Sequence, residues 1–150
     1  MTDSGPSSGK PLPEPSALAR PFWAALRNRQ LHLQRCTDCG HFNHPPRITC
    51  PKCHGKALAW TEVAPRGTVY SYTIVHRAPM PCFKADLPYA VVLVDIDGTP
   101  ARLLSNLLAP AAQVHIGMRV DLVFEPASDE ITLFKFAPAA LPKDAPHAQH

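Results

Sequence analysis

Four cysteines in two closely spaced pairs are the residues of this chain best suited to chemistry. Cys36 and Cys39 form the first Cys-x2-Cys pair, Cys50 and Cys53 form the second, and ten residues separate the pairs. Thiolates at this spacing can surround one soft cation tetrahedrally, and Zn2+ is the ion that four-thiolate structural sites usually hold. Such a site uses every coordination position for the protein, so the array predicts a structural zinc ion with no open position for substrate.

Two other interpretations of the array are a pair of disulfide bonds and a chance coincidence. The N-terminal stretch lacks the basic and then apolar pattern of a secretory signal, and no apolar run reaches the ~18 residues of a membrane span. We therefore expect a cytoplasmic protein, in which thiols stay reduced and paired cysteines favour metal binding over disulfides. His41, His44 and His54 lie nearby, but four thiolates complete the coordination shell, so we expect no histidine ligand.

No group of residues in the sequence is typical of a catalytic site. Cys82, the fifth cysteine, follows His76 by six residues, but nothing marks the orienting partner or the oxyanion hole that a Cys–His nucleophile requires. Asp95 and Asp97 stand beside a glycine in a pattern typical of hairpin turns, which favours turn residues over an acid–base pair. We therefore predict that the chain is not an enzyme by itself. A free-standing enzyme that uses Cys82 is the alternative.

One short helix and a β-rich remainder are the elements expected around the cysteine array. Pro21 can open a helix that places Phe22, Trp23 and Leu26 on one side, and residues 31–35 alternate as a strand that leads into the array. Runs of β-branched, aromatic and apolar residues predict further strands at residues 58–62, 67–75, 89–96, 101–107, 118–124 and 131–136. Short strands in this number favour a small closed barrel, so the sequence predicts a mainly β protein with a five- to six-stranded OB-fold barrel.

The chain divides into four predicted segments. Residues 1–18 and 139–150 are polar and proline-rich, and we expect both to be disordered tails. Residues 19–56 contain the helix and the cysteine array, which together predict an N-terminal helix and zinc ribbon. Residues 57–138 contain the strands of the predicted OB-fold.

Positive charge is concentrated around the cysteine array. Residues 20–56 contain seven Lys/Arg and one acid, whereas residues 57–150 contain seven Lys/Arg and nine acids, although the whole chain carries a formal charge of only +3. An anionic partner is therefore expected at the array. The alternative is a solvated basic face that offsets the charge of a zinc-loaded site. Phe22 and Trp23 beside these bases could cover an adenine or pantetheine group, or could pack the helix onto the barrel.

The order of these motifs resembles the bacterial and archaeal zinc-ribbon/OB-fold family, formerly a domain of unknown function, that is associated with thiolases and other acyl-CoA enzymes. The motifs that carry the resemblance are Phe22-Trp23, Leu31-x-Leu-Gln-Arg-Cys36, Cys39-Gly40, Pro45-Pro46-Arg47, Cys50-Pro51-x-Cys53, Gly67-x-Val69-Tyr70-Ser71-Tyr72-Thr73, Pro88-Tyr89, Arg102-Leu-Leu-Ser-Asn106 and Ile116-Gly117-Met118. One departure is the second cysteine pair, where the glycine is displaced by one position to Gly55.

The resemblance implies a rubredoxin-like zinc ribbon, an OB-fold and a role as an accessory subunit. In this family the small chain is the non-catalytic, zinc-binding partner of a thiolase-superfamily enzyme, such as a thiolase or retro-aldolase in acyl-CoA, steroid or aromatic degradation. The implied partner is a thiolase-like or lipid-transfer-type thiolase/aldolase large subunit, or a MaoC-like hydratase, in a hetero-oligomer without a membrane component.

The resemblance also makes coenzyme A or acyl-CoA a candidate ligand. Coenzyme A carries a diphosphate and a 3′-phosphate, which suit Arg47 and Lys52 as donors. Phe22 and Trp23 are the candidate contacts for its adenine or pantetheine, and the same four residues are candidates for contact with the partner.

A nucleic-acid-binding module is the alternative function. Zinc ribbons and OB-folds both occur in such proteins, and the basic residues around the cysteine array could bind an anionic polymer. However, the predicted barrel is acidic on balance, and few bases lie near Tyr70 and Tyr72, which share one strand face. We therefore expect no nucleic acid partner.

Overall fold

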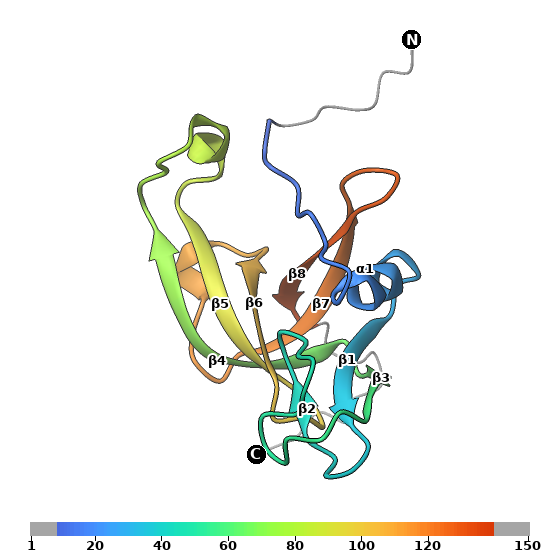
Figure 1. Cartoon of the computed structure of the whole chain (residues 1–150). Coiled ribbons are helices and arrows are strands. Elements are labelled where there is room, and N and C mark those ends of the chain that lie inside the picture. The colour runs from blue at the N-terminus through green and yellow to red at the C-terminus, as the bar shows by residue number, and fades with distance from the viewer. Residues whose placement is uncertain (1–8, 140–150) are drawn as a thin grey trace, which may run out of the picture.

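A three-stranded sheet and a closed five-stranded barrel make up most of the computed structural model, which describes residues 9–139 (Figure 1). Along the chain the elements are α1 (Arg20–Arg27), β1 (Leu31–Cys36), β2 (Phe42–Asn43), β3 (Leu58–Val63), β4 (Arg66–Val75), the 3-10 helix η1 (Pro81–Asp86), β5 (Tyr89–Ile96), β6 (Arg102–Leu107), the 3-10 helix η2 (Ala111–Gln113), β7 (Arg119–Pro126) and β8 (Thr132–Pro138). The predicted mainly β fold with one short α-helix is confirmed. None of the helices in residues 9–139 is long and apolar enough to cross a membrane.

The three-stranded sheet has the order β2-β1-β3, with β1 in the centre. β3 pairs antiparallel with β1 along its whole length, from Leu31 opposite Val63 to Cys36 opposite Leu58. The sequence predicts the strand at residues 58–62 as part of the barrel, and that prediction is wrong. The alternation of side chains identifies a strand but does not identify its partner. Here the partner is the strand that leads into the cysteine array.

The barrel has the strand order β4-β5-β6-β8-β7, and β7 pairs with β4 to close it. Neighbouring barrel strands are antiparallel except β6 and β8, which pair in parallel. The predicted turn at Asp97-Gly98 connects β5 to β6, and Gly98 has a φ of +75°, a left-handed conformation that glycine adopts without strain. Gly67 allows β4 to approach β5 closely, because a Cβ at this position would lie 2.0 Å from the carbonyl oxygen of Asp95.

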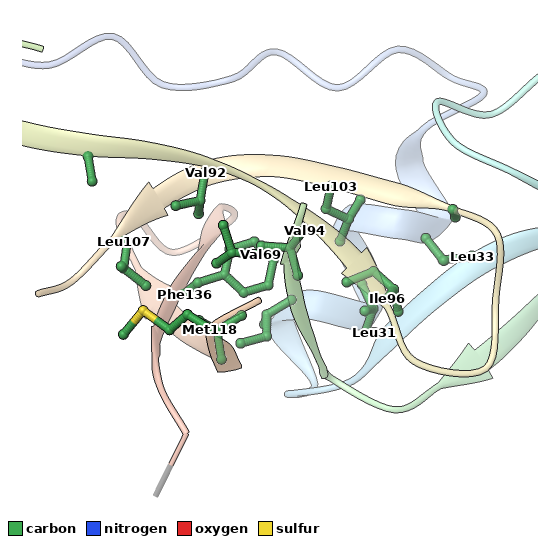
Figure 2. Close-up of a cluster of buried hydrophobic side chains, with 14 of the residues drawn as sticks. Leu31, Leu33, Val69, Val92, Val94, Ile96, Leu103, Leu107, Met118 and Phe136 are labelled. Atoms are coloured by element: carbon green, nitrogen blue, oxygen red, sulfur yellow. The ribbon is translucent and has the colours of Figure 1, made fainter. Parts of the chain in front are cut away.

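One hydrophobic core joins the sheet, the helix and the barrel. Figure 2 shows Leu31 and Leu33 of β1 together with Ile96 and Leu103 of the barrel, and all belong to the same buried cluster. The alternation is clearest in β5, where the even-numbered positions are buried. The other members of the cluster are Phe22, Leu26, Val69, Ala90, Val92, Val94, Ala101, Leu107, Val114, Met118, Val120, Leu122 and Phe136. The cysteine array is therefore attached to the barrel through packed side chains as well as through the chain.

Residues 9–18 take a defined path over the barrel, although the sequence predicts them as part of a disordered tail. Lys10 forms an ion pair with Asp86 of η1, and its ammonium lies 5.4 Å from the centre of the Phe83 ring. Pro13 and Pro15 are half-buried. The proline-rich composition did not predict this path, because prolines can bury apolar surface without forming a helix or strand. Residues 1–8 and 140–150, which contain the rest of the two predicted tails, lie outside the described residues.

An ion pair between Asp97 and Arg119 links the β5–β6 turn to β7 and gives a testable pH dependence. Arg119 donates hydrogen bonds of 2.8 and 2.6 Å to the two carboxylate oxygens of Asp97 and lowers the pKa of that carboxyl below its usual value. A lowered pKa in the folded state stabilises the fold above the unfolded-state pKa of about 3.9. This contribution disappears as the pH falls through the folded-state pKa.

We therefore expect Asp97→Asn to lower the melting temperature at pH 7, and the difference from the wild type to vanish between pH 5 and pH 2. Both side chains are more than a third exposed, so the difference at pH 7 should be small, about 2 °C or less. Thermal denaturation followed by circular dichroism across this pH range measures it. A difference that persists unchanged at pH 2 would show that the ion pair is not its source.

Candidate metal centre

Each cysteine pair lies in a tight turn with the same hydrogen bonds. The N–H of Cys36 donates to the carbonyl of His41 and the N–H of Cys50 donates to the carbonyl of Gly55, both at 2.8 Å. In return, the carbonyls of the two cysteines accept the N–H groups of Gly40 and His54, also at 2.8 Å. The two turns therefore share one conformation, and each brings two cysteines to a common centre.

The displaced glycine of the second turn has a physical reason. The left-handed position of the first turn is Gly40, with a φ of +77°, and the equivalent position of the second turn is His54, with a φ of +62°. The next residue is Gly55, where a Cβ would lie 2.7 Å from Oδ2 of Asp38 and 3.2 Å from Sγ of Cys53. A side chain at Gly55 would therefore crowd the Cys53 sulfur, while His54 adopts the left-handed backbone.

The four sulfur atoms form a compact cluster. All lie within 4.8 Å of one another, with 3.5 Å between the sulfurs of Cys36 and Cys53 and 3.6 Å between those of Cys39 and Cys50. A disulfide would require about 2.05 Å. Tetrahedral Zn–S bonds of about 2.3 Å put the sulfurs about 3.8 Å apart. The cluster has the size of a zinc site, and within residues 9–139 no histidine belongs to it.

The ionisation of the thiols also favours a bound cation. A hydrogen bond from the Cys53 N–H lowers the pKa of the Cys50 thiol to about 7. For Cys53 the Gly55 N–H lowers the pKa, but hydrogen bonding to Cys36, desolvation by the surrounding cluster and the other two thiols outweigh it and raise the value to about 12. Hydrogen bonds from neighbouring thiols favour ionisation of Cys50, whereas ionisation of Cys53 is opposed, because several thiolates at this separation repel one another. A dication removes the repulsion, so these residues fit Zn2+, which would act as a structural crosslink.

The centre lies at the surface end of β1. Cys36 and Cys50 are fully buried, whereas Cys39 and Cys53 are exposed. Cys36 is the last residue of β1, and the paired strands β1 and β3 lead from it back to the shared core. A metal here therefore fixes the free end of the sheet.

The candidate ligand-contact residues lie in different environments. Phe22 is only 3% exposed, and its ring meets that of Phe134 edge to face at 5.7 Å between centroids, so it packs α1 onto β8. Trp23 is half-buried, with its ring 6.4 Å from that of Phe134. Arg47 and Lys52 are exposed. Of the four, Phe22 is placed for packing rather than for ligand contact, and the roles of the others remain proposals.

Sequence reasoning missed Gln34, which organises the loop between the two cysteine pairs. Gln34 lies on β1 and is only 3% exposed. Its amide nitrogen donates to the carbonyl of Arg47 and its amide oxygen accepts the Arg47 N–H, both at 2.8 Å. Asn43 donates to the same oxygen at 3.2 Å. A polar residue between Leu33 and Arg35 in an alternating strand gives no signal of this role, because its burial depends on the loop that folds over it.

Two family models match the chain in succession. Residues 23–59 match the ChsH2 rubredoxin-like zinc ribbon domain, and residues 60–125 match the ChsH2 C-terminal OB-fold domain. A DUF35 domain-containing scaffold protein of Methanocaldococcus jannaschii is 32% identical over 105 residues, which are 68% of this chain and 73% of that protein. The chain belongs to the ChsH2/DUF35 family. The resemblance inferred from the cysteine array and strand motifs is therefore confirmed, as are the zinc-ribbon and OB-fold architectures.

Two further proteins are similar to this chain over most of its length. A probable enoyl-CoA hydratase alpha subunit of Thermomonospora curvata is 39% identical over 144 residues, which cover 93% of this chain and 43% of that protein. This chain thus spans less than half of that relative. A solved structure described as the Ltp2-ChsH2(DUF35) aldolase contains a chain that is 35% identical, with a TM-score of 0.76, and the match covers 86% of this chain and 100% of that chain.

Proposed function

We propose that this chain is the small, zinc-stabilised and non-catalytic subunit of an acyl-CoA enzyme. The observation that carries the proposal is the match of 86% of this chain to the whole of a chain of the Ltp2-ChsH2(DUF35) aldolase. By analogy, the large subunit is a thiolase-like or lipid-transfer-type thiolase/aldolase that contributes the catalytic residues. A MaoC-like hydratase is the other candidate, supported by the relatives named as hydratase alpha subunits. The assembly is a hetero-oligomer in the cytoplasm.

The chemistry of the chain supports a scaffolding role. Four protein ligands complete the coordination of a structural zinc ion, so the metal has no position for substrate. Cys82, the remaining cysteine, lies half-buried in η1 and does not belong to the four-sulfur cluster. The ribbon instead offers a rigid, positively charged surface to another molecule.

Coenzyme A is the small molecule that this surface suits. Arg47 and Lys52 are exposed near the metal-binding turns and can donate to phosphate oxygens, and half-buried Trp23 offers part of an aromatic face. Phe22 contributes by holding α1 in place. In this proposal the small subunit helps the large one hold acyl-CoA and does not turn it over.

The test compares the enzyme with and without this chain. For the experiment, the genes that flank the gene of this chain are searched for a thiolase-like or hydratase large subunit, and the protein so found is referred to below as the adjoining large subunit. We expect the large subunit to gain thermal stability or acyl-CoA turnover when the zinc-loaded chain is added, and the chain alone to turn over no acyl-CoA. Turnover by the chain alone, abolished in Cys82→Ala, would refute the proposal.

A nucleic-acid-binding module is the second candidate, because the ribbon is basic. The barrel argues against it. Arg102 lies 3.5 Å from the centre of the Tyr70 ring and is paired with Asp95, so the ring that would stack on a base is covered by a neutralised cation. We expect no binding of single-stranded oligonucleotides in low salt. Salt-sensitive micromolar binding in a fluorescence titration would instead favour this function.

A further inference from the structure

We propose that Arg47 and Ile48 are the anchor with which this chain docks onto its large subunit, and that Gln34 is the positioning residue that presents them. The partner surface that they fit is a small apolar pocket surrounded by carboxylates. This inference rests on the proposed function and adds to it the residues that make the contact and the chemistry of the partner surface.

The first observation is the rigidity of the anchor. Gln34 pairs with both backbone polar groups of Arg47, in the same way that a neighbouring strand would. Because the amide oxygen accepts an N–H and the amide nitrogen donates to a carbonyl, the orientation of the Gln34 side chain is defined. Cys50, a fully buried member of the metal cluster, lies two residues after Ile48. The loop is therefore held on one side by a buried amide and on the other by the metal-binding turn, so docking would order little additional chain.

The second observation is the exposure of Ile48. Its side chain is 79% exposed, the highest value among the exposed large hydrophobic residues of the described structure, and the next are Ile116 at 67% and Leu104 at 61%. An isoleucine held rigidly in solvent is a ready source of binding free energy, because burying it needs no rearrangement of the free protein.

The third observation is the charge around the anchor. Within residues 9–139, none of the seven Lys/Arg of the ribbon region (residues 20–56) takes part in an ion pair, whereas the four ion pairs of this part of the chain hold Lys10, Arg102, Arg119 and Lys135. The region contains one acid, Asp38. A zinc ion with four thiolates carries a net charge of −2, so a surplus of about four positive charges remains even when the site is loaded. The metal site alone does not neutralise this surface, which favours a carboxylate-rich partner.

A protein partner fits this combination better than nucleic acid does. An exposed isoleucine has no counterpart on a phosphate backbone, and the ribbon offers few free aromatic faces for base stacking. The ring of Phe42 is covered by the guanidinium of Arg35 at 5.2 Å, and Phe22 is buried. An apolar centre with a charged rim is instead the usual make-up of a protein–protein anchor.

The experiment measures the affinity of the zinc-loaded chain for the adjoining large subunit by calorimetry. We expect Ile48→Asp and Arg47→Glu each to weaken binding about 30-fold or more, as for a central anchor residue. The matched controls are Ile116→Asp and Arg77→Glu, which alter an equally apolar and an equally basic exposed residue outside the ribbon region. We expect them to change the affinity less than threefold. One zinc per chain in every variant shows that the metal-binding turns are intact.

Gln34→Met tests the positioning role, since methionine fills a similar volume and makes neither hydrogen bond to Arg47. We expect weaker binding with an unchanged zinc content. In the variant that carries both Arg47→Glu and Ile48→Asp, adding Gln34→Met should cause no further loss, because Gln34 acts through these two residues. A fully additive loss would show that Gln34 acts elsewhere and would overturn its role.

Three results distinguish this inference from the function on which it rests. If the wild-type chain does not bind the large subunit, the proposed function fails and the anchor fails with it. If the wild type binds and Ile48→Asp and Arg47→Glu bind within threefold of it, the anchor is refuted while the function stands. If the wild type binds single-stranded DNA and Arg47→Glu abolishes that binding, the surface is a nucleic acid site and the inference is overturned.

Discussion

Cys36→Ser is expected to abolish zinc binding and to unfold both metal-binding turns, while the barrel remains folded. Cys36 is fully buried and ends β1, so its loss removes one of four thiolates at the point where the sheet meets the metal. Structural zinc supplies roughly 10–16 kcal/mol of apparent binding free energy in small domains, as much as or more than the net stability of a typical protein. Leu31 and Leu33, at the other end of β1, stay packed in the barrel core and limit the unfolding to the metal end.

Hydrogen exchange and metal analysis measure this result together. In the wild type, the amides of Gly40 and His54 donate within the two turns and should exchange slowly. In Cys36→Ser they should exchange at unfolded rates, with less than one zinc per ten chains, while amides of β5 remain protected. Cys82→Ser is the control, and it should retain one zinc per chain. Protected turn amides in Cys36→Ser would contradict a metal-dependent ribbon.

Phe136→Ala is expected to have the second largest effect, a loss of about 3–5 kcal/mol in the free energy of unfolding. Phe136 is fully buried on β8, and its ring meets that of Phe134 edge to face at 6.4 Å between centroids. It lies opposite Leu107, where β6 and β8 form their parallel pair, so its removal leaves a cavity at the junction of three strands. Figure 2 places its ring among the side chains of the barrel strands.

Urea unfolding of the zinc-loaded chain measures the change. Leu104→Ala on β6 is the matched control, because Leu104 is 61% exposed and its truncation should cost less than about 0.5 kcal/mol. Phe136→Ala should therefore lower the urea midpoint several times more than Leu104→Ala does. Equal midpoints would show that the barrel core does not determine the stability of the chain.

The cysteine array and most strands could be predicted from the sequence because both depend on local chemistry. Spacing alone identifies a four-thiolate site, and Asp97-Gly98 identifies a hairpin turn whatever surrounds it. The strand at residues 58–62 was also recognisable as a strand. Its pairing with β1 was not, because pairing is decided by contacts between segments that are distant in the sequence.

The features of the site that could not be predicted all depend on neighbours in space. Gly55 stands one position later than in the regular pattern because of Asp38 and the Cys53 sulfur, which lie beside it only in the folded turn. In the sequence, Gln34 is one polar residue of an alternating strand. Its role depends on the loop with Arg47, which covers it only in the folded chain. These tertiary contacts convert a metal-binding motif into a surface that presents particular side chains.

The most direct test of the proposed subunit role is the mass of the wild-type chain co-expressed with the adjoining large subunit, measured by size-exclusion chromatography with light scattering. We expect a single peak that contains both chains in a fixed ratio, with one zinc for each copy of this chain. Two separate peaks, with this chain eluting alone at or near a multiple of its 16.4 kDa mass, would contradict it.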